Sequence, residues 1–332
     1  MNNLRTHILR RLLLLAAALL TLPGIVTAQS DPQLTQYWAL PAFYNAGAAG
    51  ASDYLRVRGG TRMQWIGIDG APQSFFIQAD SPLVIGRKRI GLGVQMQQEK
   101  IGLFSNMLLG VQGAYKFKLF KGELSAGFQL GYFNQKFSGS KIENPGDDDY
   151  HQPDDEAIPK EDLNGSAFDL GVGIFYTKPR FWVGVSGTHL LKPTIKMSLQ
   201  GSENTETQEF ESELGRMVYF MGGCNFPIKN TLFVLEPSAL VKTDFNFFTA
   251  EVTMRATYNR FLTFGVAYRY NDAVSAMIGA TFRNFFLGYS YDYPLSAIGK
   301  VSSGSHEIVA GYQLKLDFSG KNKNKHRSIR IM

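Results

Sequence analysis

Apolar and polar side chains alternate along much of the chain, most clearly near its end. One face of an extended strand there would carry only apolar or small residues: Ile308, Ala310, Tyr312, Leu314, Leu316 and Phe318. The other face would be mixed: Val309, Gly311, Gln313, Lys315 and Asp317. A period of two predicts a β-strand. Soluble strands average about 5–6 residues, whereas a strand that crosses a bilayer needs about 9–11. The length of this run therefore favours a membrane-spanning strand.

The same alternation recurs along the chain and predicts an all-β fold. We expect strands at these residues: 53–63, 72–80, 89–98, 105–118, 122–137, 166–177, 180–189, 214–226, 231–243, 246–258, 260–271, 273–283, 284–292 and 305–318. Long linkers, such as 138–165, alternate with short ones, such as 120–121. Bacterial outer-membrane barrels have short periplasmic turns and longer extracellular loops. The pattern thus predicts a transmembrane antiparallel β-barrel of about 14 strands with both ends in the periplasm.

Composition narrows the alternatives. Aromatic residues make up 13% of the chain and charged residues 19%, below the roughly 25% typical of soluble domains. No apolar run after residue 28 approaches the ~18 residues of a helical membrane span, which excludes a polytopic helical protein. The single cysteine excludes a disulfide scaffold, and five scattered histidines argue against a metal centre. The rival folds are a soluble sandwich and a propeller, whose outer faces would be more polar.

The two ends of the chain differ from its middle. Residues 1–28 resemble a secretory signal, with Arg5, Arg10 and Arg11 before the apolar stretch 12–20 and small residues before Gln29. The alternative is a single anchoring helix. We assign 29–52 to a periplasmic N-terminal segment, 53–318 to the barrel and 319–332 to a basic periplasmic tail. The tail holds much of the excess positive charge, which argues against a nucleic-acid-binding face.

Four sequence blocks together carry a family resemblance. They are DPQLTQYWALPAFYNAGAAG (31–50), RMQWIGIDGAPQSF (62–75), GLGVQMQQEKIGLFSN (91–106) and GIFYTKPRFWVGVSGTHLLKP (173–193). In this order they resemble the PorP/SprF family of Bacteroidetes outer-membrane proteins over essentially the whole mature chain. The chain departs from the family pattern at 45–50, which reads Asn-Ala-Gly-Ala-Ala-Gly where the family tends to have Asn-Pro-Ala-Tyr-Ala-Gly.

The resemblance implies a non-enzymatic component of the type IX protein secretion and gliding motility apparatus in the outer membrane, without a cofactor. Its partners would be membrane lipid and either the periplasmic ring and translocon proteins or a secreted adhesin that is exported and retained at the surface. The residues do not separate these two roles. A porin-like channel or small-molecule transporter is the alternative, and a phospholipase or protease barrel is a more distant one.

Two groups of residues are candidate partner-binding sites. The segment before the first strand is rich in aromatic side chains: Tyr37, Trp38, Phe43 and Tyr44. It either fills the lumen or docks on a partner, since a free tail would be less apolar. Trp65, in the first hairpin, either contacts a partner or packs at the membrane interface or in the lumen. The tail cations would attract an acidic periplasmic surface: Lys321, Lys323, Lys325 and Arg327.

The linker 138–165 is strongly acidic. It includes Asp147, Asp148 and Asp149, followed by further carboxylates. Clustered carboxylates favour Ca²⁺, but the linker lacks the spacing of an EF-hand. The two interpretations are therefore a calcium site and a solvated surface loop.

Overall fold

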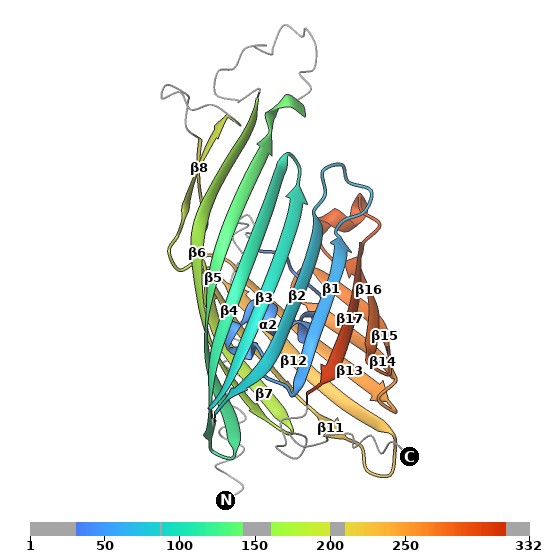
Figure 1. Cartoon of the computed structure of the whole chain (residues 1–332). Coiled ribbons are helices and arrows are strands. Elements are labelled where there is room, and N and C mark those ends of the chain that lie inside the picture. The colour runs from blue at the N-terminus through green and yellow to red at the C-terminus, as the bar shows by residue number, and fades with distance from the viewer. Residues whose placement is uncertain (1–30, 87, 142–160, 200–209, 317–332) are drawn as a thin grey trace, which may run out of the picture.

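Fourteen antiparallel strands close into a barrel in which the last strand, β17, pairs with the first, β1 (Figure 1). The computed structural model describes residues 31–86, 88–141, 161–199 and 210–316. The predicted signal segment, most of the acidic linker and the basic tail at 319–332 lie outside these residues. The predicted barrel fold is confirmed, while the predictions for those three segments stay predictions.

Each of the fourteen predicted strands corresponds to one barrel strand. The barrel strands are β1 Tyr54–Met63, β2 Gln73–Ile85, β3 Lys88–Ile101, β4 Phe104–Leu119, β5 Gly122–Ser138, β6 Asp162–Lys178, β7 Phe181–Thr188, β10 Met217–Cys224, β12 Phe233–Thr243, β13 Phe248–Tyr258, β14 Leu262–Arg269, β15 Ala273–Phe282, β16 Phe285–Pro294 and β17 Ser305–Lys315. A two-residue strand, β11 (Phe226–Pro227), extends β10 along β12. Within the described residues, no helix combines the length and apolar character needed to cross a bilayer.

One prediction about the linkers was wrong, because 190–213 contains a hairpin. Strands β8 (Thr194–Leu199) and β9 (Phe210–Glu213) pair with each other, and β8 also pairs with the upper end of β6. Ile195 and Met197 alternate correctly for a strand and pack against Leu108 and Phe133 of the barrel wall. The apolar run is too short to be distinguished from a loop by its periodicity alone.

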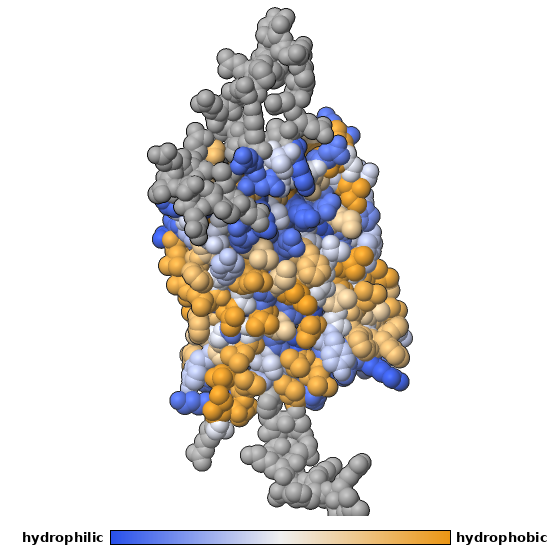
Figure 2. Space-filling model, turned by 45° about the horizontal axis from the view of Figure 1, so that its top comes forward, coloured by the Kyte–Doolittle hydropathy of each residue, from blue (hydrophilic) through white to orange (hydrophobic). Residues whose placement is uncertain are grey.

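The alternation separates a lipid face from a lumen face as predicted. In β17, Ile308, Ala310, Tyr312 and Leu314 are exposed on the outside, whereas Val309 is fully buried. Figure 2 shows apolar side chains as a band across the visible face of the barrel, which we call the belt. The exposed large apolar residues are spread over nearly every strand, which fits a surface solvated by lipid chains rather than by water.

The apolar belt predicts that a charged substitution on the lipid face lowers stability by an amount that depends on its depth in the membrane. Val252 lies in the middle of β13 and is 59% exposed on the outer face. We expect Val252→Arg to lower the free energy of unfolding by about 2–4 kcal/mol, because arginine at the bilayer midplane is poorly solvated. Leu314 is next to the last residue of β17, near a membrane interface, so Leu314→Arg is expected to cost only about 0–1 kcal/mol. Urea unfolding in lipid vesicles measures both losses, and equal losses would contradict the assigned depth.

The barrel has one end with short turns. The β4–β5 turn is Phe120-Lys121, and the β13–β14 turn begins with Asn259-Arg260. All four residues have positive φ, between 47° and 61°. Two successive positive φ angles are typical of type I′ hairpin turns, for which Asn-Gly is the preferred sequence. Turn geometry alone would not select Phe120, Lys121 or Arg260, because a non-glycine residue with positive φ costs about 1–3 kcal/mol of backbone strain.

Candidate functional site: the plug segment

The chain that precedes β1 lies inside the barrel (Figure 1). We call residues 31–50 the plug segment. It contains three short helical pieces: η1 (Tyr37–Ala39), α2 (Pro41–Tyr44) and η2 (Ala46–Ala48). Pro41 occupies the first turn of α2, where its missing N–H costs nothing. Nearly every residue of the plug segment is buried, and the segment supplies half of the buried members of the main hydrophobic cluster.

Glycines of the barrel wall make room for the backbone of the plug segment. A Cβ added to Gly91 of β3 would lie 1.9 Å from the carbonyl oxygen of Ala49, and one on Gly127 of β5 would lie 2.5 Å from the oxygen of Ala46. Real Cβ atoms do not approach backbone atoms this closely, so Gly91 and Gly127 fit the plug segment only as glycine. At three further wall positions, Gly173, Gly184 and Gly288, an added Cβ would instead meet side-chain atoms of Asn45 or Gln36, which would have to shift.

Asn45 joins the plug segment to two neighbouring strands. Its side-chain nitrogen donates to the backbone oxygens of Ile174 in β6, at 3.0 Å, and Val185 in β7, at 3.2 Å. Its side-chain oxygen accepts from the backbone N–H of Gly47, at 2.8 Å, and so caps η2. The Asn45–Gly50 stretch thus keeps a compact turn against the wall, although it lacks the proline and tyrosine of the family pattern.

A buried ionic network surrounds Thr35. The hydroxyl of Thr35 accepts from Arg62, at 3.1 Å, and from Arg269, at 3.0 Å, and donates to Asp292, at 2.9 Å. The backbone N–H groups of Thr35 and Gln36 each donate to the Glu307 carboxylate at 2.8 Å. Two arginines and two wall carboxylates therefore converge on one threonine of the plug segment.

The two arginines also bind carboxylates directly. Arg62 lies 2.7 Å from Asp292 and 3.3 Å from Glu307, and Arg269 lies 2.8 Å from Glu251 and 3.3 Å from Asp292. All five side chains are almost completely buried. A buried charge without a partner carries a large desolvation cost, so each of these side chains stays buried only because the others neutralise it.

A second polar cluster holds the beginning of the plug segment. The Asp31 carboxylate lies 3.0 Å from Nε2 of His189 and accepts from the hydroxyl of Tyr219, while Nζ of Lys242 donates to the Asp31 backbone oxygen at 3.0 Å. Nδ1 of His189 lies 3.0 Å from Asp169. Burial opposes ionisation of Asp31, but the charge of His189 and the hydrogen bonds from His189 and Tyr219 lower its pKa to about 2.

Amides and cations hold the rest of the plug segment. Gln112 Nε2 donates to the backbone oxygen of Ala42 at 2.7 Å and to Gln129 at 2.7 Å. Lys116 donates to the backbone oxygen of Gly50, whose N–H donates to Asp80 at 2.8 Å. Polar contacts therefore reach the plug segment from one end to the other, and from strands on several sides of the barrel.

The predicted aromatic residues lie in this segment. Tyr37, Phe43 and Tyr44 are buried, and the Tyr37 hydroxyl donates to Ser238 at 2.9 Å. Trp38 is half-buried, with the Arg255 guanidinium 3.7 Å from its ring centroid. In this arrangement the rings contact the barrel interior, and a partner would reach them only after the plug segment moves. Their role in partner binding stays a prediction.

Trp65 lies apart from those four residues. It sits half-buried in the β1–β2 loop, at the end of the barrel opposite the short turns, and its backbone N–H donates to the Ser305 hydroxyl at 3.1 Å. The four candidate tail residues lie outside the described part of the chain, so the structure does not test them.

Sequence reasoning missed most of the polar residues that hold the plug segment. Arg62 belongs to a family block, but no pairing with another charged residue followed from this. Asp169, Asp292 and Glu307 gave no indication of their role beyond being charged residues in alternating strands, and Asp31 none beyond beginning a family block. Among the described residues, no group of three or more His, Cys, Asp or Glu side chains is arranged to hold a metal ion. The arrangement fixes a polypeptide in the lumen.

Comparisons of the sequence and of the structure with known proteins agree with an outer-membrane barrel fold. The family model described as type IX secretion system membrane protein PorP/SprF matches residues 26–312. No curated protein matches the chain. The toluene transporter TbuX of Ralstonia pickettii is 11% identical, with a TM-score of 0.50, 83% of this chain covered and 93% of that chain. A FadL homologue of Pseudomonas aeruginosa is 10% identical, with a TM-score of 0.46 and coverages of 88% and 99%. The similarity to TbuX concerns the barrel fold alone.

Proposed function

The chain belongs to the PorP/SprF family of type IX secretion system membrane proteins, and from this premise we propose that it is a closed scaffold for that system. The family and the barrel place the protein in the bacterial outer membrane. In the proposed role the barrel is not an enzyme and uses no cofactor. It binds other components of the secretion system and does not itself conduct the secreted protein.

The observation that carries this proposal is the filled lumen. The plug segment is buried against the wall, and wall glycines, the Thr35 network and Asn45 all fit it closely. A secreted polypeptide passing through this barrel would have to displace the segment and leave buried charges without partners. Docking on an outer surface requires neither change, so the filled lumen supports a scaffold.

The proposed partners are the periplasmic ring and translocon proteins, with a secreted adhesin as a second candidate. A ring partner would contact the short-turn end, which is periplasmic in bacterial barrels, and an adhesin would contact the long loops. Photo-crosslinking residues placed at Lys121 and Arg260, compared with Asp69 and Lys300 at the opposite end, test this in native membranes. Crosslinks to periplasmic secretion components at the short-turn end support the scaffold, and their absence at both ends would contradict it.

The alternative is a channel or small-molecule transporter, a possibility that the fold likeness to a toluene transporter keeps open. We expect the purified barrel to show little single-channel conductance in a planar bilayer, because the plug segment fills the lumen. Deleting residues 33–48 should produce larger, more frequent current steps if the barrel still inserts. Large, stable conductance of the intact protein would contradict a closed scaffold and favour the channel.

A further inference from the structure

Each short turn of the barrel carries a cation. The described residues include at least one exposed lysine or arginine at or beside each of the six turns: Lys88, Lys121, Arg180, Lys229, Arg260 and Arg283. All six side chains are exposed. The described residues of these turns include no aspartate or glutamate. No ion pair between described residues includes any of the six cations, so no described carboxylate neutralises their positive charge.

Two carboxylates near this end, among the described residues, are already engaged. Asp53 pairs with Arg89, and Glu123 lies 3.5 Å from both Arg89 and Lys116. The six turn cations therefore form a ring of positive charge, which we call the short-turn rim. Its members come from strands all around the barrel, so the rim faces every direction in the plane of the membrane rather than one side.

Aromatic rings accompany the cations. The Lys88 ammonium lies 5.9 Å from the ring centroid of Tyr115, and the Arg283 guanidinium lies 5.4 Å from that of Phe282. Phe120 and Phe261 are exposed in the turns that hold Lys121 and Arg260. Exposed rings beside cations are typical of the membrane interface, where the ring lies at the head-group level and the charge reaches the phosphate layer.

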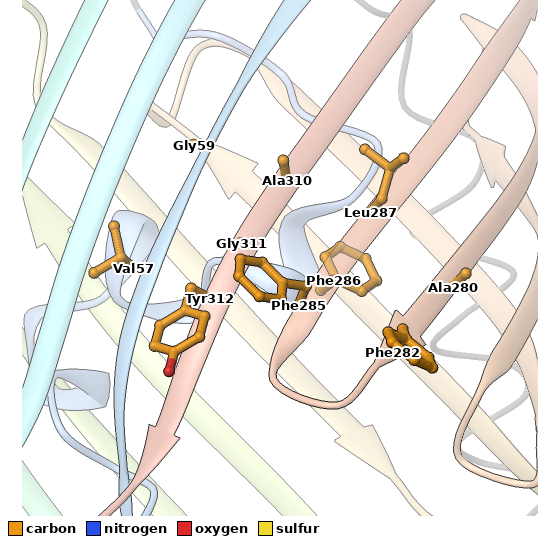
Figure 3. A pocket seen from close by; sticks show the side chains of 10 residues that line it. All are labelled: Val57, Gly59, Ala280, Phe282, Phe285, Phe286, Leu287, Ala310, Gly311 and Tyr312. Atoms are coloured by element: carbon orange, nitrogen blue, oxygen red, sulfur yellow. The ribbon is translucent and has the colours of Figure 1, made fainter.

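An apolar groove begins beside this rim. Figure 3 shows its lining residues, which come from β1, β15, β16 and β17. Most of them lie on the outer face of the barrel, whereas Phe286 is buried and packs against Trp38 of the plug segment. Small residues at outward positions, Gly59, Ala280 and Ala310, leave the groove open between larger neighbours. Phe282, Phe285 and Tyr312 lie at its rim end, where the side chain of Asn284 donates to the Tyr312 hydroxyl at 3.4 Å.

We propose that the short-turn rim is a binding surface for anionic phospholipid, with one acyl chain held in the groove over β15, β16, β17 and β1. The phosphate would lie by Arg283 and Asn284, and the chain would extend from there toward the bilayer centre. Short turns of bacterial outer-membrane barrels face the periplasm, so the lipid belongs to the inner leaflet.

The arrangement favours lipid over an acidic protein as the occupant. A protein partner docked on this end would cover one sector of the rim and leave the other cations to the lipid, because the cations surround the barrel. The groove is continuous with the lipid-facing belt and is lined almost entirely by apolar side chains. Cations close to an anionic bilayer surface each strengthen binding, so the ring acts additively.

Native mass spectrometry of the whole mature barrel tests the proposal, with equimolar phosphatidylglycerol and phosphatidylcholine in mild detergent. We expect at least about a fivefold preference for phosphatidylglycerol. The triple variant Lys121→Gln/Arg260→Gln/Arg283→Gln should lose this preference. The matched control, Lys100→Gln/Lys136→Gln/Lys300→Gln, removes three exposed cations from the opposite end and should keep it.

A second pair of variants tests the groove separately from the charge. Ala310→Leu fills the groove and should reduce the amount of retained phosphatidylglycerol several-fold, whereas Ala126→Leu adds the same atoms at another exposed outer position and should not. Equal lipid preference in the two triple variants would overturn the proposal. A rim variant that keeps its lipid but loses a periplasmic protein from native membranes would also overturn it, since the rim would then be a protein-docking surface.

Discussion

Replacing Gly127 by alanine is expected to prevent the plug segment from seating normally. The new Cβ would lie 2.4 Å from the carbonyl carbon of Ala46 and 2.5 Å from the backbone nitrogen of Gly47. These are backbone atoms of a segment held at several other points, so they cannot move aside as a flexible side chain would. Overpacking typically costs about 1–3 kcal/mol, and we expect a loss near 3 kcal/mol because neither side of the contact can yield.

Two measurements test the Gly127→Ala variant. Urea unfolding in vesicles reports the loss of stability, and planar-bilayer recordings report whether the lumen opens when the plug segment is displaced. Gly215→Ala is the matched control, since a Cβ at Gly215 meets nothing within 4 Å. It should change stability by less than about 0.5 kcal/mol. If Gly127→Ala resembles Gly215→Ala in both measurements, the close fit between wall and plug segment is wrong.

The glycines show where prediction from the sequence succeeds and where it stops. Alternating apolar residues and small residues predict a barrel whose inner face leaves space, because both signals are local. What fills the space is not local: Gly173 is placed against Asn45, far earlier in the chain, only after both strands and segment have folded. The alternation also predicted every barrel strand, since bilayer-spanning strands are long enough for the pattern to stand out.

The buried charges are harder to predict for a related reason. Arg62, Asp292 and Glu307 each sit at an inward position of an alternating strand, where a charged residue fits a water-filled lumen equally well. Only the closure of β17 on β1 brings the three together around Thr35. The aromatic residues of 31–50 indicated that this segment lies in an apolar environment. The sequence left open whether the barrel lumen or a partner protein provides that environment.

Replacing Arg269 by methionine is expected to have the second large effect. The side chain uses all three of its nitrogens: Nε contacts Glu251 at 2.8 Å, Nη1 contacts Asp272 at 2.9 Å, and Nη2 contacts Thr35 at 3.0 Å. Methionine has a similar length but would leave the Glu251 carboxylate buried without its main partner. Removing one side of a buried ion pair costs about 3–5 kcal/mol, and we expect a loss of that size in urea unfolding.

Three further variants separate the charge of Arg269 from its shape. Arg269→Lys keeps the charge but not the fork of nitrogens, so an intermediate loss is expected. Arg269→Met combined with Glu251→Gln removes the stranded charge and should recover part of the loss of the single variant. Lys192→Met is the control, because its pair with Glu213 has side chains 50% and 55% exposed and exposed pairs contribute about 0–1 kcal/mol. If Arg269→Met costs no more than Lys192→Met, the buried network does not hold the plug segment, and the wall glycines and Asn45 must do so without it.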